Sequence, residues 1–280
     1  MYFTKNNDKK MLKYYRKLPF FKGKSKLGRI LFKNIINKNE SLEFTAHQNI
    51  KYKIPNTFES LGVELLITGI YENKIVRFLN SNIKSGDIYF DIGANIGALG
   101  LPVVKNQPNI KYVAFEASPI VYDYLKENFS INEIKNYELH NYVVHEDDNQ
   151  AMKFYQFEKY GKSSLAPTFT EEYTFVDSIS LDTFCIKKNV NKINWIKIDV
   201  QGFELFVFKG LQQLLRNKKV ENILFEFEPW EEEAAGLEKG AAQNHLISLG
   251  YDLFDINGNK FSQIITDERT MIWAKPSLLS

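Results

Sequence analysis

The sequence contains very little cysteine: Cys185 is the only one among 280 residues. A single thiol excludes an intramolecular disulfide framework and fits a reducing compartment. Because Phe184 and Ile186 flank Cys185, we expect it to pack in the core rather than to act as a nucleophile.

Long apolar runs are also absent. No stretch approaches the roughly 18 residues of a membrane span, and no hydrophobic signal segment follows the basic start. We therefore expect a soluble, cytoplasmic protein. With 44% hydrophobic residues the chain can bury one large core, which predicts a main domain over 56–280 and an extension over 1–55.

Histidine is scarce, and the 4 histidines show no His-x-x-x-His or Cys/His spacing. A zinc site is therefore not expected. His47, His140 and His245 fit ordinary, partly buried positions better than ligand positions.

Acidic residues are few near the N-terminus, where residues 1–53 hold 14 Lys or Arg against 3 Asp or Glu. Four apolar residues recur there at helical spacing beside lysines, namely Met11, Leu12, Tyr15 and Leu18. This predicts an amphipathic basic helix. A second pattern predicts a face that docks on the domain, namely Leu27, Ile30, Leu31 and Ile35. A solvated basic face and attachment to the inner, anionic membrane surface both stay open, and we expect no nucleic-acid partner.

The most informative motif spans residues 87–97, Asp-Ile-Tyr-Phe-Asp-Ile-Gly-Ala-Asn-Ile-Gly. It predicts a buried strand, a tight glycine loop and then a helix. A dinucleotide loop needs Gly-x-Gly-x-x-Gly, whereas here an acid ends the strand and the glycines are spaced Gly-x-x-x-Gly. A carboxylate attracts the cationic groups of S-adenosylmethionine and repels a pyrophosphate. The motif therefore predicts S-adenosylmethionine as cofactor, with contacts from Asp91, Gly93, Ala94, Asn95 and Gly97.

A second acid follows the next strand, 111–115. Glu116 lies about 25 residues after Asp91, the length of one βαβ unit, where an acid accepts hydrogen bonds from ribose hydroxyls. The alternative is a cap for the helix that begins near Ser118. We expect Ala117, Val144 and His145 to complete the cofactor site, His145 at the adenine edge.

Six motifs in order resemble the FkbM family of S-adenosylmethionine-dependent methyltransferases. They are Gly69-Ile-Tyr-Glu72, Asp91 to Gly97, Phe115-Glu-Ala-Ser-Pro119, Gly161-Lys-Ser-Ser-Leu165, Ser180-Leu-Asp182 and Ile196-Lys-Ile-Asp-Val-Gln-Gly-Phe-Glu204. Two positions depart from the family pattern: Gln201 replaces a frequent Glu, and His145 replaces a small residue. The resemblance implies an α/β, Rossmann-like class I methyltransferase fold with a seven-stranded, mostly parallel sheet, an antiparallel C-terminal hairpin and here a basic N-terminal helical extension.

Hydrophobic periodicity predicts alternating strands and helices beyond the glycine loop. The expected strands are 44–54, 88–92, 111–115, 137–144, 151–157, 175–180, 194–200, 221–228, 251–256 and 270–275. The expected helices are 70–82, 97–105, 119–130, 182–189, 203–216 and 231–249. Asp182 and Gly202 fit helix caps, and Asn257-Gly258 fits a hairpin turn.

Asp199 ends a predicted central strand, at the sheet edge where open α/β sheets bind ligands. We expect it to act as the general base for an acceptor hydroxyl, with a structural cap or a cofactor-orienting group as the alternative. Glu226 and Glu228 share one side of the next strand by period-2 alternation and are expected near Asp199. Acceptor contact is favoured over a divalent metal for these carboxylates.

Three further residues are expected at the acceptor: Ser163, Ser164 and Glu72. A surface turn for the serines and a helix-dipole role for Glu72 are the alternatives. The whole pattern predicts O-methylation of a hydroxyl on a sugar or glycan intermediate. A lipid, peptide or polyketide acceptor, an NAD-dependent oxidoreductase and a non-catalytic nucleotide-binding module are the alternatives.

Overall fold

The computed structural model describes residues 5–36 and 38–277, with side chains from Lys10 onward. None of the helices in this described part of the chain has the length and apolar character of a membrane span. Residues 1–4 of the predicted extension lie outside the described residues.

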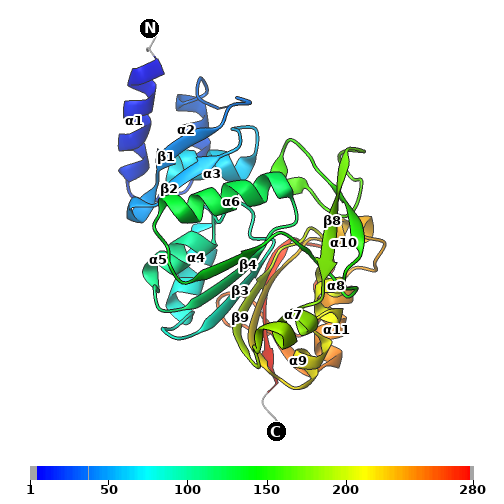
Figure 1. The fold of residues 1–280 in the computed structure, drawn as a ribbon. Helices are drawn as coiled ribbons and strands as arrows, with labels where there is room; N and C mark the ends of the chain where they lie inside the picture. Colours follow the sequence, from blue (N-terminus) through cyan, green and yellow to red (C-terminus); the bar gives the residue numbers. More distant parts are fainter. Residues whose placement is uncertain (1–4, 37, 278–280) are drawn as a thin grey trace.

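A seven-stranded sheet forms the centre of the molecule (Figure 1). Its strands are β3 (Ile88–Ile92), β4 (Lys111–Phe115), β5 (Tyr137–His140), β9 (Ile193–Ile198), β10 (Val220–Phe227), β11 (Tyr251–Phe254) and β12 (Thr270–Pro276). They lie in the order β11-β12-β10-β9-β3-β4-β5, and only β12 runs antiparallel to its neighbours. The predicted Rossmann-like architecture is confirmed. The strand order reverses between β3 and β9, the place where such sheets bind ligands.

Helices cover both faces of the sheet, because alternate strand residues are apolar on each side. Tyr89 belongs to the core under one layer and Phe90 to the core under the other. The first layer contains α3 (Ser60–Thr68), α4 (Asn73–Asn82), α5 (Gly100–Asn106) and α6 (Pro119–Ile131). The second contains α7 (Leu181–Lys188), α8 (Glu204–Lys209), α9 (Gln212–Arg216) and α11 (Ala241–Ser248).

A small second sheet is inserted between β5 and α7. It consists of β6 (Val143–Val144), β7 (Ala151–Tyr155) and β8 (Tyr173–Ile179), in the order β6-β8-β7. The segment between β7 and β8 contains the short helix η2 (Tyr160–Lys162). Phe169 of this segment packs against Trp230 of α10 (Pro229–Ala234), with ring centres 5.8 Å apart.

The N-terminal segment packs on the main body through two helices and a hairpin. These are α1 (Lys5–Lys17), α2 (Lys24–Leu31), β1 (Leu42–Thr45), η1 (His47–Asn49) and β2 (Lys51–Ile54). Tyr52 and Ile54 of β2 are buried in the core beneath α6. The side-chain amides of Asn128 on α6 and of Asn132, its C-cap residue, bond the backbone of β2 on both its N–H and C=O groups. The hydrophobic core therefore continues across the predicted boundary at residue 55.

Several predicted elements are divided in the structure. The predicted strand 44–54 is the β1–β2 hairpin, because Gln48 and Asn49 adopt positive φ and turn the chain. The predicted strand 137–144 breaks after His140, and its end, β6, joins the second sheet. The predicted helices 203–216 and 231–249 are each two helices, and α3 was not predicted because it is apolar on all sides.

One prediction of a helix cap and one prediction of a docking face are wrong. Ser180 caps α7 by accepting from Thr183 N, while Asp182 accepts from the first N–H groups of α9 instead. The α2 face predicted to dock is exposed at Leu27, Ile30 and Leu31. The contact is made by the opposite face, because Gly28 lets α2 approach Ile67 of α3 more closely than any side chain would allow; a Cβ at Gly28 would lie 2.2 Å from Ile67 Cγ2.

Candidate active site

A cavity of about 240 Å³ opens at the carboxyl ends of β3, β9 and β10. Its wall combines the β3–α5 loop, the β4–α6 turn, the β9–α8 loop and the second sheet's β7–β8 segment. Charged side chains dominate it: Glu59, Glu116, Asp199, Glu226, Glu228, Glu231, Lys162, Lys197 and Arg269. Negative charge therefore exceeds positive charge around the cavity.

Gly93 sets the shape of the cavity floor. Its φ is +72°, and a Cβ at this position would lie 1.9 Å from the carbonyl oxygen of Asp199. The backbone N–H of Asp199 also donates to Ile92 O at 3.1 Å. A residue with a side chain cannot take this conformation at this distance, so the β3 loop and the end of β9 meet only because Gly93 is glycine.

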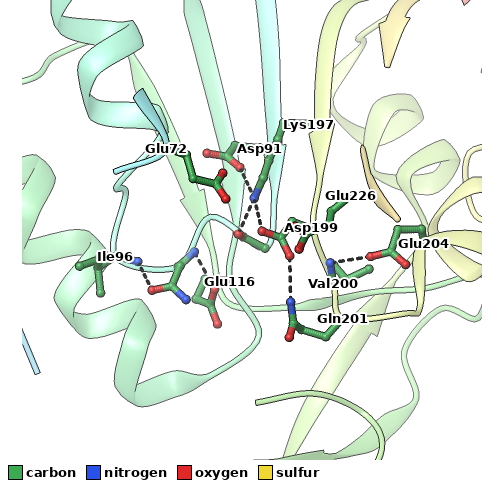
Figure 2. A network of polar contacts seen from close by, with 12 residues as sticks. Glu72, Asp91, Ile96, Glu116, Lys197, Asp199, Val200, Gln201, Glu204 and Glu226 are labelled. Carbon is green, nitrogen blue, oxygen red and sulfur yellow. Dashed lines mark hydrogen bonds and ion pairs between the residues drawn. The ribbon is translucent and has the colours of Figure 1, made fainter. Parts of the chain in front are cut away.

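Lys197 is a buried cation beneath the cavity (Figure 2). Its Nζ donates to Gly93 O at 2.9 Å and lies 3.4 Å from Asp91 Oδ1 and 3.6 Å from Asp199 Oδ2. Strand register brings the first pair together, since Asp91 pairs with Lys197 across β3 and β9. Burial lowers the pKa of Lys197, but the carboxylates outweigh it and raise the pKa above its ordinary value, so the ammonium stays charged.

Glu116 ties the β3–α5 loop to the β4–α6 turn. Its Oε2 accepts from Asn95 N at 2.8 Å and its Oε1 accepts from Ser118 N at 2.9 Å. The alternative role as the α6 cap falls to Ser118, whose hydroxyl accepts from Val121 N. Burial raises the pKa of Glu116 to about 7, although both backbone hydrogen bonds lower it. Each oxygen keeps a lone pair for a ligand on the cavity side.

Asp199 faces the cavity from the end of β9. Gln201 donates its amide to Asp199 Oδ1 at 3.1 Å, so the carboxylate is held between Gln201 and Lys197 (Figure 2). Gln201 and Gly202 both have positive φ, which turns the chain from β9 toward α8. Glu at position 201, frequent in the family, could not donate this hydrogen bond.

Glu226 lies on β10 beside Asp199, because Phe225 pairs with Ile198 in the parallel register. It is buried, and Arg269, which directly precedes β12, donates Nε to its Oε1 at 2.6 Å. Arg269 also lies 3.9 Å from Glu228 Oε2 and 3.9 Å from Glu72 Oε1. Burial and then Asp199 raise the pKa of Glu226 to about 8. Asp199, Glu226 and Glu228 therefore lie near one another, as predicted, and Arg269 lies among them.

Two further acids crowd the same end of the sheet. Glu204 accepts from Val200 N at 3.0 Å, and burial raises its pKa to about 7. Burial, then the charges of Glu204 and Asp199, raise the pKa of Glu231 to about 9. Burial first, and then the neighbouring charges, therefore favour the protonated form of part of these carboxyl groups near neutral pH.

The second sheet supplies an aromatic and basic wall. Lys162 Nζ lies 4.8 Å from the Phe169 ring centre and 5.9 Å from that of Trp230, and these two rings meet edge to face. Tyr160 lines the cavity with a buried hydroxyl that has no hydrogen-bond partner among the described residues. The hydroxyl lies beside Gly62 of α3, where a Cβ would come within 2.8 Å of it.

Ten of the predicted site residues line this one cavity. They are Gly93, Ala94, Asn95, Glu116, Ala117, Val144, Ser163, Asp199, Glu226 and Glu228. The Ser163 hydroxyl also accepts from Phe157 N, so it holds the β7–β8 segment in shape.

Five predicted site residues do not line the cavity, and two of them support the β3–α5 loop. Asp91 is wholly buried beneath the floor, where Tyr112 donates to its Oδ2 at 2.7 Å. A Cβ at Gly97 would lie 3.1 Å from the Phe129 ring and 3.2 Å from Leu125, so Gly97 serves packing on α6 rather than cofactor space.

The other three serve the surroundings. His145 stacks on Phe206 with ring centres 4.9 Å apart, in the outer layer rather than at an adenine edge. The Ser164 hydroxyl is buried in a bond to Ala166 O, which favours the turn alternative. Glu72 begins α4 at a positive φ without capping it, and Asp199 helps burial to raise its pKa, so it borders the acid cluster.

Sequence reasoning missed Lys197, Arg269, Glu231 and Lys162. A lysine inside the apolar run Ile196-Lys-Ile198 was the available signal for Lys197, since a buried cation needs carboxylate partners. Arg269 has no local signal, because it reaches Glu226 only through the antiparallel pairing of β10 with β12.

Comparison with known proteins agrees with this arrangement. A family model described as the methyltransferase FkbM domain matches residues 91–259. Methyltransferase sdnD of Sordaria araneosa is 26% identical over 50% of this chain and 68% of its own length. Hexuronic acid methyltransferase AglP of Haloferax volcanii is 26% identical over 52% of this chain and 59% of its own length. An uncharacterized protein of Methanocaldococcus jannaschii, MJ1452, is 31% identical over 32% of each chain.

Proposed function

The chain belongs to the FkbM methyltransferase family, and we propose that it transfers a methyl group from S-adenosylmethionine to a hydroxyl oxygen of a sugar or glycan intermediate. The observation that supports this most is the shared cavity, which exposes both Glu116 and Asp199. Glu116 suits the cofactor, and Asp199 suits the acceptor.

The residues present fit S-adenosylmethionine. Each Glu116 oxygen keeps a lone pair for a ribose hydroxyl, and Glu116 lines the cavity together with Gly93, Ala94 and Asn95 of the β3–α5 loop. The excess of carboxylates over cationic groups favours a ligand with ammonium and sulfonium charges over one with a pyrophosphate.

The chemistry divides between the cofactor and Asp199. When bound, S-adenosylmethionine supplies a methyl carbon whose bond to sulfur breaks as the bond to oxygen forms, the electron pair remaining on sulfur. Asp199 would accept the proton of the acceptor hydroxyl, while Gln201 and Lys197 keep its carboxylate oriented.

The acceptor wall suits a polyhydroxy compound. Glu226 and Glu228 can accept hydroxyl hydrogens, Arg269 can donate, and Trp230 offers an apolar face to a sugar ring. AglP is described as a hexuronic acid methyltransferase. In this chain the excess of carboxylates disfavours an acceptor with its own carboxylate, so we propose a neutral sugar.

The cytoplasm is the proposed place of action. A single, buried Cys185 that has no disulfide partner is compatible with that reducing compartment.

Calorimetric titration of the full chain with S-adenosylmethionine and, separately, with NAD tests the cofactor. We expect binding of the first only; binding of NAD alone would favour the oxidoreductase. Release of S-adenosylhomocysteine is then measured with neutral sugars, uronic acids, and lipid, peptide and polyketide hydroxyl compounds as acceptors. Turnover with neutral sugars supports the proposal, turnover confined to another class moves the acceptor there, and cofactor binding without turnover on any of them favours the binding module.

A further inference from the structure

The outer surface of α1 and α2 gathers exposed apolar side chains. Eight large apolar residues between Met11 and Leu31 are exposed, although many others of this size are buried in the described core. They are Met11, Tyr14, Leu18, Phe20, Phe21, Leu27, Ile30 and Leu31. We call these eight residues the α1–α2 outer surface. Contiguous exposed apolar surface in a folded protein marks an interaction site.

A different side of α1 and of α2 packs on α3. Leu12 and Tyr15 of α1 and Phe32 after α2 are buried with Val63 and Ile67 of α3. The exposed residues therefore lie on other faces of α1 and α2 than the ones packed on α3.

Buried polar contacts fix the two helices to each other and to α3. Lys24 donates to the carbonyl oxygens of Arg16 and Leu18 at the end of α1, and Tyr15 donates to Lys24 O at 2.6 Å. Arg16 donates Nε to Leu66 O at 2.8 Å. Arg16 and Lys24 therefore form buried contacts, and these contacts fix the position of the α1–α2 outer surface.

The remaining cations border the exposed apolar residues. From Lys10 to Asn39 the sequence holds ten Lys or Arg and no Asp or Glu. Seven of these lysines are exposed, namely Lys10, Lys13, Lys17, Lys22, Lys26, Lys33 and Lys38. Apolar residues between lysines match a surface that is negative at the headgroups and apolar below them.

We propose that the α1–α2 outer surface docks the protein on an anionic lipid bilayer. A second copy of the chain would bring two strongly basic surfaces together, which is unfavourable. Nucleic acid would satisfy the lysines but would not bury Leu27, Ile30 and Leu31. Phe20 and Phe21, in the turn between the helices, add aromatic side chains suited to the interface.

Co-sedimentation of the full chain with lipid vesicles tests the proposal. Vesicles of phosphatidylcholine alone are compared with vesicles that also contain phosphatidylglycerol, at low and at high salt. We expect binding to the anionic vesicles to be stronger by about tenfold or more, and to weaken with salt, since polybasic attraction is screened.

Paired variants separate the apolar and basic contributions. Ile30→Ser with Leu31→Ser should weaken vesicle binding by about tenfold, because two apolar side chains no longer enter the bilayer. The matched control is Ile186→Ser with Ile247→Ser on α7 and α11, since Ile186 is 68% exposed and Ile30 is 64% exposed. Lys17→Gln with Lys26→Gln should weaken binding at low salt only, against the control Lys105→Gln with Lys187→Gln.

Equal sedimentation with and without vesicles would overturn the proposal, as would equal losses in the control variants. If Ile30→Ser with Leu31→Ser instead dissociates a dimer in analytical ultracentrifugation and leaves vesicle binding unchanged, the occupant is a second copy. Tighter binding to an RNA or DNA oligomer than to anionic vesicles would assign the surface to nucleic acid. Thermal unfolding should be unchanged in every variant, because all of these side chains are exposed.

Discussion

The two halves of the cavity differ in how their polar groups are satisfied. On the β3–β4 side, Glu116 accepts two backbone N–H groups, and Asp91 is bonded by Tyr112 and paired with Lys197. On the β9–β10 side, Asp199 and Glu226 face one another, and Arg269 is shared among several carboxylates.

The β3–β4 half of the cavity is therefore preorganised, whereas the β9–β10 half is completed by a ligand. The first half comes mainly from one stretch of chain, 88–118, with Lys197 of β9 as a partner from outside it. The second is drawn from four distant segments, and burial together with neighbouring carboxylates raises the pKa values of Glu226 and Glu231. An acceptor that donates hydroxyl hydrogens would relieve that crowding. Variants in the first half should therefore affect cofactor binding, and variants in the second should affect turnover.

Gly93→Ala should have the largest effect. The added Cβ would meet the Asp199 carbonyl at 1.9 Å, and φ is +72°, so the loop and the end of β9 must separate. We expect a loss of about 2–4 kcal/mol of stability together with loss of measurable cofactor affinity. Thermal unfolding and calorimetry provide the two measurements.

Gly258→Ala is the matched control for Gly93→Ala. Its φ is +89°, but a Cβ there meets nothing within 4 Å, so it isolates the cost of the backbone conformation. If the two variants lose the same stability and both bind cofactor, the close approach at Gly93 does not shape the site.

Asp199→Asn should come next. The change keeps the size and the bond to Gln201 but removes the base, so turnover should fall by about 10²- to 10⁴-fold. Cofactor affinity, measured by calorimetry, should change by no more than a few-fold. Loss of affinity with retained turnover per bound cofactor would make Asp199 part of the cofactor half.

A requirement for a metal ion would change the role that we assign to Asp199 and Glu226 in the β9–β10 half of the cavity. If a chelator abolishes wild-type turnover and magnesium restores it, Asp199 and Glu226 are better described as metal ligands. That outcome would also remove the predicted contrast between the halves.

Glu116 gives the first half a pH dependence. Its pKa of about 7 means that ribose hydroxyls meet an ionised carboxylate only as the pH rises through that value. From about pH 6 to about pH 8 the ionised fraction rises from roughly a tenth to nine tenths, so affinity should rise about ninefold. In Glu116→Gln this rise should be absent; a rise that persists in the variant belongs to another group.

The same shift affects stability with a defined sign. The pKa of Glu116 is higher in the folded protein than its ordinary value of 4.5, so the folded state holds the proton more tightly. Its contribution favours folding at low pH and is lost between about pH 4.5 and pH 7. Bound cofactor should oppose that loss.

Gln201→Met should have the smallest effect. It removes the amide that orients Asp199, but Asp199 is partly exposed and water can replace the donor. Turnover should fall by about three- to tenfold with unchanged cofactor affinity. Gln213→Met, on the exposed side of α9, controls for the change of residue type; an equal fall there would refute the orienting role.

The first half was predictable because it is local in sequence. Strand, glycine loop and following acid lie within 30 residues, and β3 and β4 match the predicted bounds. The proximity of Glu226 to Asp199 was also predictable, from strand alternation. The prediction for His145 failed because the chain turns after His140, which sends the residue to α8 instead of the cavity.

The rest of the site and the outer face of α2 depend on contacts between distant segments, which local sequence patterns do not encode. Arg269 joins Glu226 through β12, which is inserted between β10 and β11 in the sheet. The outward face of α2 was assigned to the core because apolar periodicity marks a stripe without saying what covers it.

The second sheet begins and ends at the same place. Val143 and Val144 pair with Ser178 and Ile179, and His145 N donates to Ile179 O at 3.1 Å, so the excursion between them closes on itself. Lengthening such a closed excursion costs little chain entropy, because that cost grows only with the logarithm of its length. The segment that carries Tyr160 and Lys162 can thus vary in length at little cost to the fold, and exchanging it for the segment of a relative would test whether it sets the acceptor preference that we propose.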